Sequence, residues 1–450
     1  MKRIVAAILS AMLLTMGVLS GCTQAPKEPV LLTMWHVYGN QTDSDMNELV
    51  DEFNKTVGKD KGISIQVTML ANSDYIHTAL VDAANGVPGA GSLPDIFVAY
   101  PKTAIVIGTD ILLDWNEYFT QEEMNEYIPA FVEEGIIDGK QIVFPMAKST
   151  EVCFLNNTVF RRFSADSGYT LEDLDTWEGM FEVMAEYYAW TDGLTPDVPN
   201  DGKAFMFYDS PFNFVQLTAL QLGGSFFQGD DIAYDDAIAK EAWTLWAGAA
   251  AAGHINLQFG YGTTQIMTGE ALCEIGSTAS IAYFSDTVVY PDNTTDPLEV
   301  VVVPFPVIGG AEKSAVQRGT GLCAVAGDKD KEKAAVEFIK WFTGIEANTE
   351  FCVRMGYMPV KAEAYEALFA GGFDDIEAAD VRSLYESIAV MYRDYEFYPS
   401  PLFDSYGQLH DDYVTEMRLI LRPYQEDFDA DVDAAAEESW IELENRLGGK

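Results

Sequence analysis

Residues 30–38, VLLTMWHVY, form an apolar and aromatic run that predicts a β-strand near the start of the folded chain. Residues 45–55 follow with their apolar side chains on one helical face, and residues 63–69 alternate between apolar and polar, as a second strand would. A helix over 75–84 and a short apolar strand over 94–98 continue the pattern. Because strands and helices alternate, the sequence predicts an α/β fold with a parallel sheet.

The remainder of the chain predicts helices separated by short apolar strands. Thr176 is placed as the N-cap of a helix that begins at Trp177. The other expected helices span 211–222, 236–252 and 330–342, and a mostly helical tail runs from about 383 to 447. The expected strands are 141–145, 152–155, 271–275 and 299–303.

The N-terminus has the features of a bacterial export signal. A basic start precedes an apolar run over residues 4–18, and LSGC, residues 19–22, resembles the lipobox of bacterial lipoproteins. We therefore expect a signal peptide over 1–21, lipidation of Cys22 after cleavage, and a polar tether over 22–29. An ordinary signal peptide with an incidental cysteine is the alternative.

Length and charge bound the class of protein. A chain of 450 residues supports two or three domains. It carries 27 Lys and Arg against 71 Asp and Glu, a net charge of −44. This balance argues against binding of nucleic acid, which needs a basic surface. Because the acidic residues are spread along the chain, we interpret them as a solvated surface.

Four cysteines follow Cys22, and each lies in an apolar run without a C-x-x-C pattern. They are Cys153, Cys273, Cys323 and Cys352. Such dispersed cysteines predict reduced residues of the core, with one disulfide pair as the alternative.

Residues 318–324, RGTGLCA, match the dinucleotide pattern G-x-G-x-x-A. That pattern requires a helix to begin at the glycines so that its amides meet the pyrophosphate. Here the glycines lead into an apolar stretch that predicts a strand, so a backbone bend is the favoured interpretation.

Alternating aspartates at 427, 429, 431 and 433, with Glu438 twelfth from the first, imitate a calcium loop. The sixth position needs glycine and holds Val432. Aspartates at the N-terminus of a helix are the better account, and we expect no metal and no cofactor.

The sequence gives no support for a zinc protease or a serine hydrolase of the usual layout. The chain has four histidines and contains neither H-E-x-x-H nor G-x-S-x-G. Two of the many carboxylates could still serve a glycoside hydrolase, which remains a remote alternative.

Nine segments occur in order along the chain: LLTMWHVYG, LPDIF, ILLDWNEYF, GKQIVFPMAKSTEVCFLNNTVF, TWEGMFEVMAEYY, LQLGGSFF, MTGEALCEIGS, VVVPFP and KDKEKAAVEFIKWFTGIEANTEFCVRMGYMPV. Together they resemble one family, the family 1 extracellular solute-binding proteins of ABC importers, which includes maltose-binding proteins. The last block is the most distinctive, and the resemblance runs from about Val30 to the C-terminus.

The resemblance implies a two-lobed, class II periplasmic-binding-protein-like fold whose discontinuous lobes are joined by hinge crossovers. The expected crossovers are 146–150, 275–278 and 326–330. The expected N-terminal lobe is 30–146 plus 278–326, and the expected C-terminal lobe is 147–277 plus 327–450. Such proteins close around a ligand that lies between the lobes.

The resemblance also implies ligand contacts from both lobes. Carried over position by position, these are His36, Tyr38, Asn40, Tyr100, Lys102, Lys148, Ser149, Phe212, Asn213, Ser277, Thr278, Arg318, Gly319, Thr320, Phe403 and Tyr406. Aromatic rings at the ends of elements can stack on a sugar, although core packing explains any one of them equally well.

The implied function is capture of a small carbohydrate and its delivery to an ABC permease, without enzymatic activity. The implied protein is a monomer held by its lipid at the outer face of a Gram-positive cell membrane. A phosphorylated polyol such as a glycerophosphate is the alternative ligand, because Lys102, Lys148 and Arg318 are cations in a very acidic chain.

Overall fold

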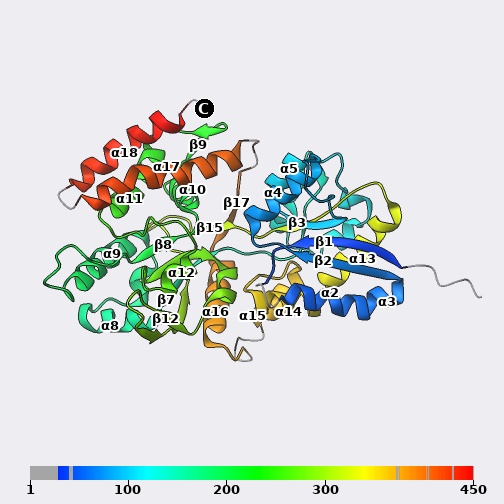
Figure 1. Ribbon diagram of the computed structural model, residues 1–450, viewed down its shortest axis with the longest axis horizontal. Helices are drawn as coiled ribbons and strands as arrows, with labels where there is room; N and C mark the ends of the chain where they lie inside the picture. Colours follow the sequence, from blue (N-terminus) through cyan, green and yellow to red (C-terminus); the bar gives the residue numbers. More distant parts are fainter. Residues whose placement is uncertain are drawn as a thin grey trace, which may run out of the picture.

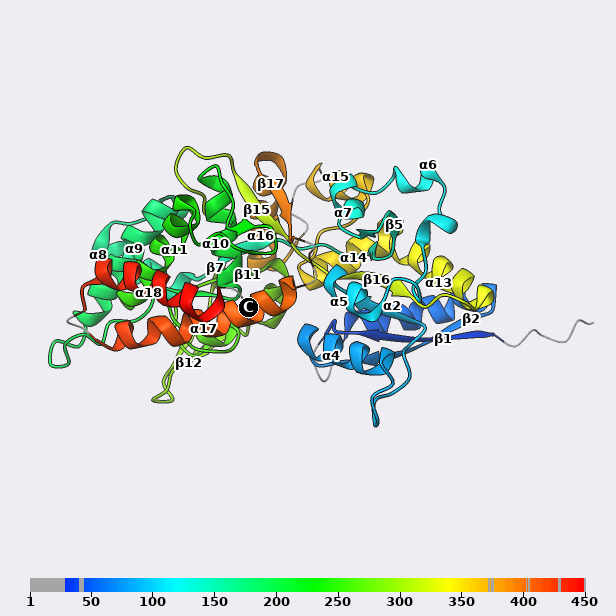
Figure 2. The same ribbon diagram turned by 90° about the horizontal axis from the view of Figure 1, so that it is seen from above.

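The computed structural model describes residues 29–39, 44–370, 373, 376–401, 403, 405–427 and 430–448. The chain forms two α/β lobes that lie side by side along the long axis (Figures 1 and 2). The expected site residue Asn40, the expected signal peptide and Cys22 lie outside the described residues.

The first lobe is built on a five-stranded sheet in the order β2-β1-β3-β16-β6. Its strands are β1 (Val30–His36), β2 (Ile63–Met69), β3 (Ile96–Ala99), β6 (Phe144–Pro145) and β16 (Gly321–Ala324), and β4 (Ile136–Ile137) and β5 (Lys140–Gln141) form a separate hairpin. Its helices are α2 (Asp45–Lys55), α3 (Val57–Lys61), α4 (Ser73–Ala84), α5 (Pro101–Ile107), η1 (Trp115–Glu117), α6 (Gln121–Met124), α7 (Pro129–Glu133), α13 (Lys329–Phe342), α14 (Ile345–Met355) and α15 (Ala362–Ala370).

The second lobe is built on a four-stranded sheet in the order β14-β7-β11-β8. Its strands are β7 (Glu151–Asn156), β8 (Met206–Tyr208), β11 (Cys273–Ser277) and β14 (Val300–Val303). Short pairs are β9 (Phe227–Gln228) with β10 (Asp231–Ile232), β12 (Thr287–Val289) with β13 (Thr295–Pro297), and β15 (Ser314–Gln317) with β17 (Glu396–Pro399). Its helices are α8 (Asn157–Ser167), η2 (Leu171–Leu174), α9 (Trp177–Asp192), α10 (Pro211–Gln221), α11 (Ala237–Ala251), α12 (Gly262–Met267), η3 (Thr278–Tyr283), α16 (Ala379–Asp394), α17 (Tyr406–Glu426) and α18 (Val432–Leu447).

The sheets differ from the expected parallel arrangement. In the first lobe β1 pairs parallel with β2 and β3, as alternating strands and helices require. Strand β16 instead runs antiparallel to β3 and β6, because it enters this sheet from the other lobe. Likewise β7 is antiparallel to both of its neighbours in the second sheet. Both sheets are therefore mixed.

The lobe boundaries expected at 278 and 326 also differ from the structure. Strand β14 pairs with β7, so the stretch from 278 to β14 belongs to the second lobe. Helix α13 packs on β1 and α14 packs on α2, so the distinctive block that they form belongs to the first lobe. The expected crossovers at 275–278 and 326–330 consequently lie inside one lobe each.

The chain passes between the lobes at residues 146–150, between β15 and β16, and between α15 and α16. The first two crossovers are hydrogen bonded to each other: the Ser149 N–H donates to Arg318 O at 2.9 Å, and the Arg318 N–H donates to Ser149 O at 2.7 Å. Lys148 also exchanges backbone hydrogen bonds with Met358. The first two crossovers therefore form one ladder between the lobes, and Met358 of the first lobe extends it.

The Lys148 side chain, an expected ligand contact, is buried in this ladder. Its ammonium group pairs with Glu134, and the two side chains are 3% and 6% exposed. Gln317 Nε2 donates to the same carboxylate at 2.6 Å. Because both charges are paired and hydrogen bonded, the ion pair is tolerated out of water.

Local structure follows the sequence closely in several places. Helix α2 covers residues 45–55 as expected, and the Thr176 side chain accepts a hydrogen bond from the Gly179 N–H at the start of α9. Residues 321–324 form strand β16, so Gly319 and Gly321 lead into a strand and do not open a helix. The Asp431 side chain caps α18, which agrees with aspartates at a helix start.

The four described cysteines are free and buried, as expected. Cys323 lies on β16 and Cys352 on α14 in the first lobe, and Cys153 and Cys273 lie on β7 and β11 in the second. Burial raises the pKa of Cys273, Cys323 and Cys352.

Gly319 in the second crossover has a φ of 103°, and a β-carbon there would lie 2.7 Å from Ala147 O. We expect Gly319→Ala to lower the free energy of unfolding by about 3 kcal/mol, because it adds a backbone clash to a strained conformation. Gly310→Ala is the matched control, since φ is 81° there and the space is open. It should cost about 1 kcal/mol in the same urea titration. Equal losses would contradict the close approach of the crossovers.

Candidate functional site

Arg318, on the second crossover, lies at the junction of the two lobes. Its Nη1 lies 2.7 Å from Oε1 of Glu151, which begins β7 directly after the first crossover. The Glu151 side chain is fully buried, whereas that of Arg318 remains 27% exposed. The guanidinium group is therefore held by a buried carboxylate, and part of the Arg318 side chain stays open to solvent.

Two neutral donors complete the environment of Glu151. Tyr208 Oη donates to Oε2 and Asn213 Nδ2 donates to Oε1, each at 2.7 Å. Burial raises the pKa of Glu151, while Arg318 and these two donors oppose that rise. Tyr208 ends β8 and Asn213 lies in the first turn of α10, so several elements of the second lobe converge here.

Arg318 also interacts electrostatically with groups from three further segments. These are Tyr100, which precedes α5 in the first lobe, Asp209, which follows β8, and Tyr406, which begins α17. Tyr100 and Asp209 are half-buried. The Arg318 guanidinium group thus lies among carboxylates and phenol groups at the junction of the two lobes.

Exposed aromatic rings of the second lobe reach the first lobe beside this place. Tyr261, which is 56% exposed, lies beside the Asn72 side chain, and Tyr283, which is 45% exposed, lies beside the Gly39 backbone. Further along the junction, Lys102 lies against Gly407, and Asp411 on α17 interacts electrostatically with Lys102 and His77.

Several expected contact residues lie in the core instead. His36 is fully buried, and its Nε2 lies 2.8 Å from Asn47 Oδ1. Burial lowers the pKa of His36 to about 4, so the ring is neutral. Tyr38 is 1% exposed and lies 2.6 Å from the Thr320 hydroxyl, which is also buried.

The remaining expected residues are either buried or have a structural role at a crossover or a helix start. Phe212 and Thr278 are fully buried, and Ser149 contributes its backbone to the crossover ladder. Ser277 caps η3, and Gly319 shapes the crossover. Phe403 and Tyr406 pack on each other edge to face at the start of α17. The structure therefore brings together Tyr100, Asn213, Arg318 and Tyr406, with Lys102 at one end of the junction.

The residue that organises the site, Glu151, was missed from the sequence. A glutamate that opens an apolar strand directly after a crossover was the available signal, since a buried carboxylate needs a partner. Asp209, Tyr261 and Tyr283 were missed as well, and no local pattern in the sequence marks them.

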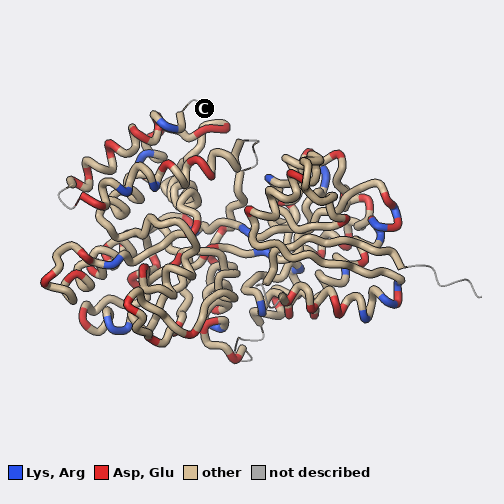
Figure 3. Tube along the Cα trace, viewed as in Figure 1, with Lys and Arg blue, Asp and Glu red and all other residues tan. Residues whose placement is uncertain are grey.

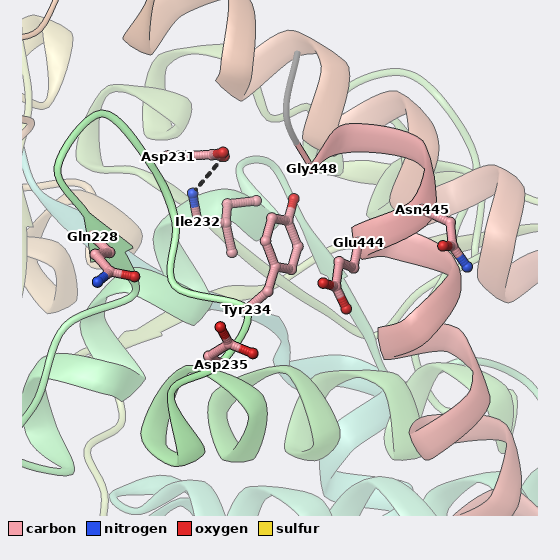
Figure 4. Close-up of a pocket in the computed structure, with 8 residues that line it drawn as sticks. All are labelled: Gln228, Asp231, Ile232, Tyr234, Asp235, Glu444, Asn445 and Gly448. Carbon is pink, nitrogen blue, oxygen red and sulfur yellow. Dashed lines mark hydrogen bonds between the residues drawn. The ribbon is translucent and has the colours of Figure 1, made fainter.

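A separate pocket of about 390 Å³ lies between the β9–β10 hairpin and the end of α18 (Figure 4). Its lining residues are Gln228, Asp231, Ile232, Tyr234, Asp235, Glu444, Asn445 and Gly448. All of them belong to the second lobe, so this pocket does not involve the junction.

No helix in the described ranges is both long and apolar enough to cross a membrane. In the same residues, no three His, Cys, Asp or Glu side chains are grouped to hold a metal ion.

Comparison with solved structures identifies the class of fold. A binding protein for cyclic α-maltosyl-1,6-maltose from Arthrobacter globiformis is 19% identical, with a TM-score of 0.64 over 94% of this chain and 100% of that chain. An ABC substrate-binding protein from Listeria monocytogenes in complex with cycloalternan is 17% identical, with a TM-score of 0.68 over 94% and 100%. UgpB from Mycobacterium tuberculosis in complex with glycerophosphocholine is 14% identical, with a TM-score of 0.67 over 92% and 97%.

These similarities define a two-lobed α/β binding-protein fold, as expected. Residues 48–376 match the family described as bacterial extracellular solute-binding protein, and the chain belongs to that family. No curated protein matches the chain in sequence.

Removing the Arg318 guanidinium group should reveal how much the burial of Glu151 lowers the free energy of unfolding. We expect Arg318→Met to lower the free energy of unfolding by about 3 kcal/mol, because a buried carboxylate loses its charged partner. Adding Glu151→Gln to it should recover part of that loss.

The matched control is Arg162→Met, since Arg162 pairs with Asp296 while 53% exposed. That change should cost less than about 1 kcal/mol. Similar losses for Arg162→Met and Arg318→Met in urea unfolding would contradict the role given to the buried pair.

Proposed function

We propose that this protein captures a small neutral carbohydrate between its lobes and delivers it to the permease of an ABC importer. The observation that carries the proposal is the placement of Arg318, which is paired with Glu151 and keeps 27% of its side chain exposed, among polar and aromatic groups of both lobes. Polar groups of this kind fix the hydroxyls of a sugar, and flat rings such as Tyr261 and Tyr283 can cover its apolar face.

The charges at the junction favour a neutral ligand over a phosphorylated one. Glu151 already balances Arg318, and Glu134 balances Lys148 in the crossovers. Lys102 faces Asp411 of the other lobe. A phosphate would need unpaired cations, although the fold is shared with a structure solved in complex with glycerophosphocholine. A phosphorylated polyol is therefore the second candidate.

The ligand contacts that we propose are Tyr100, Asn213, Arg318 and Tyr406 from the sequence-based set, with Asp209, Tyr261 and Tyr283 added. The protein would act as a monomeric receptor without catalysis. Its acidic residues are distributed over both lobes (Figure 3). That distribution suits a solvated surface and opposes binding of nucleic acid, which needs a basic surface.

We further propose that a lipid on Cys22 holds the protein at the outer face of the membrane, next to its permease. The sequence LSGC at residues 19–22 supports this. We expect Cys22→Ser to move the protein from the membrane fraction to the culture medium, because the anchor is lost. Immunoblots of the two fractions measure this, and an unchanged membrane fraction would contradict the anchor.

Thermal unfolding with maltose, maltotriose, a cyclic oligosaccharide and glycerophosphocholine tests the ligand class. A true ligand at one hundred times its dissociation constant should add about 2.7 kcal/mol of stability. A response to glycerophosphocholine alone would favour the second candidate. Silence across a broad sugar panel would contradict the first.

With a responding sugar, we expect Tyr261→Ala to weaken binding at least tenfold by calorimetry, because a stacking ring is lost. Tyr424→Ala is the matched control, since Tyr424 lies near the end of α17 and contacts Glu438. It should leave affinity unchanged. Equal effects of the two substitutions would remove Tyr261 from the site.

A further inference from the structure

A second carboxylate cluster lies beneath the loop that carries Tyr261. Glu274, on β11, is fully buried, and neither of its carboxyl oxygens accepts a hydrogen bond from a described donor. The polar side chains that face it are those of Asp209 and Ser280. A buried carboxylate that makes no close hydrogen bond is costly, and it is costlier still beside a second carboxylate.

Two glycines show how closely the carboxyl groups are packed. A β-carbon on Gly276 would lie 2.5 Å from Glu274 Oε1 and 2.8 Å from Asp209 Oδ2. A β-carbon on Gly262 would lie 2.4 Å from Glu274 Cγ. The Glu274 side chain therefore fits only because Gly262 and Gly276 have no side chains. Its carboxyl group lies next to that of Asp209, since both lie against Gly276.

The two carboxyl groups have different surroundings. Asp209 Oδ1 accepts from the Gly262 N–H at 2.9 Å, and Arg318 and Arg418 both stabilise its charge. The groups that act on Glu274 among the described residues are Asp209, Ser280 and Cys273 on the same strand, none of them a cation. The negative charge consequently belongs on Asp209 and the proton on Glu274.

The bond to Gly262 connects this pair to the junction. Gly262 begins α12 and directly follows Tyr261, the ring that meets Asn72 of the first lobe. The Asp209 N–H donates to Ile275 O at 3.0 Å, which fixes Asp209 to β11. Asp209 thus connects the end of the loop that carries Tyr261 to β11 of the second sheet.

We propose that Asp209 and Glu274 share one proton, and that the protonated pair holds the loop of residues 257–261 in position against the first lobe. A donor on Glu274 gives Asp209 a charge-assisted hydrogen bond and leaves its other oxygen for Gly262. Loss of the proton sets two negative charges side by side, which pushes Asp209 from Gly262 and frees Tyr261. Where it concerns solute capture, this inference rests on the proposed function.

The direction of the pH effect follows from the burial of Glu274, which raises its pKa. Below the pKa of the unfolded chain the group is protonated in both states, and stability is unaffected. As pH rises above that value, only the unfolded chain ionises freely, so the folded state loses stability. Glu274→Gln keeps the shape and a donor but removes this loss.

Thermal unfolding of the ligand-free protein from pH 5 to 9 is the first measurement. The midpoint of Glu274→Gln should exceed that of the wild type by a margin that widens as pH rises. Glu241→Gln on α11 is the control, since Glu241 is exposed. Its difference from the wild type should not change with pH. A constant margin for Glu274→Gln would show that Glu274 carries no proton, and would overturn the proposal.

Hydrogen–deuterium exchange of peptides that cover residues 256–268 is the second measurement. After correction for intrinsic rates, exchange in the wild type should be several-fold faster at pH 9 than at pH 6, and Glu274→Gln should remove that increase. Asp209→Asn, which cannot form the charged pair, should remove it too. Exchange that does not depend on pH would overturn the proposal. Neither measurement uses a sugar, so failure of the carbohydrate assignment would leave both results unaffected.

Discussion

The backbone ladder at the crossovers is the constraint on which the rest of the molecule depends. Ser149 and Arg318 exchange two hydrogen bonds, and Lys148 and Met358 exchange two more. Because the first two crossovers are bonded to each other, they act as one connection between the lobes, and the chain makes a further connection between α15 and α16. A change in the relative orientation of the lobes must be absorbed at backbone dihedral angles in or next to the ladder and at this further crossover. The same ladder places Arg318 at the edge of both lobes.

Ion pairs at the crossovers use scarce cations in an acidic chain. With 27 Lys and Arg against 71 Asp and Glu, most carboxylates must face water alone. Two of these few cations, Lys148 and Arg318, instead form ion pairs with the carboxylates Glu134 and Glu151. Buried pairs of this kind add little net stability, but a mispaired arrangement would leave charges uncompensated. Their placement therefore fixes which segments can lie together at the connection.

The sequence predicts the local elements much better than their partners. The alternation of apolar residues locates β1, β2 and α2, and a threonine before an apolar helix locates the start of α9. The same patterns cannot tell whether β14 joins the first sheet or the second, because pairing with β7 joins residues far apart in the chain. For the same reason Arg318 was found as a candidate and Glu151 was not. A cation in an acidic chain can be singled out from the sequence alone. Its buried partner can be identified only from the structure, in which the two crossovers lie together.

The buried cysteines give each lobe its own chemical reporter. A thiol reagent attacks the thiolate, and burial both hides these sulfurs and, at Cys273, Cys323 and Cys352, disfavours the charged form. Labelling thus requires that the surrounding strands or helices open. Since Cys323 and Cys352 lie in the first lobe and Cys153 and Cys273 in the second, the order in which they are alkylated reveals which lobe opens first. The four described cysteines, which are free, thereby report how independently the two lobes unfold.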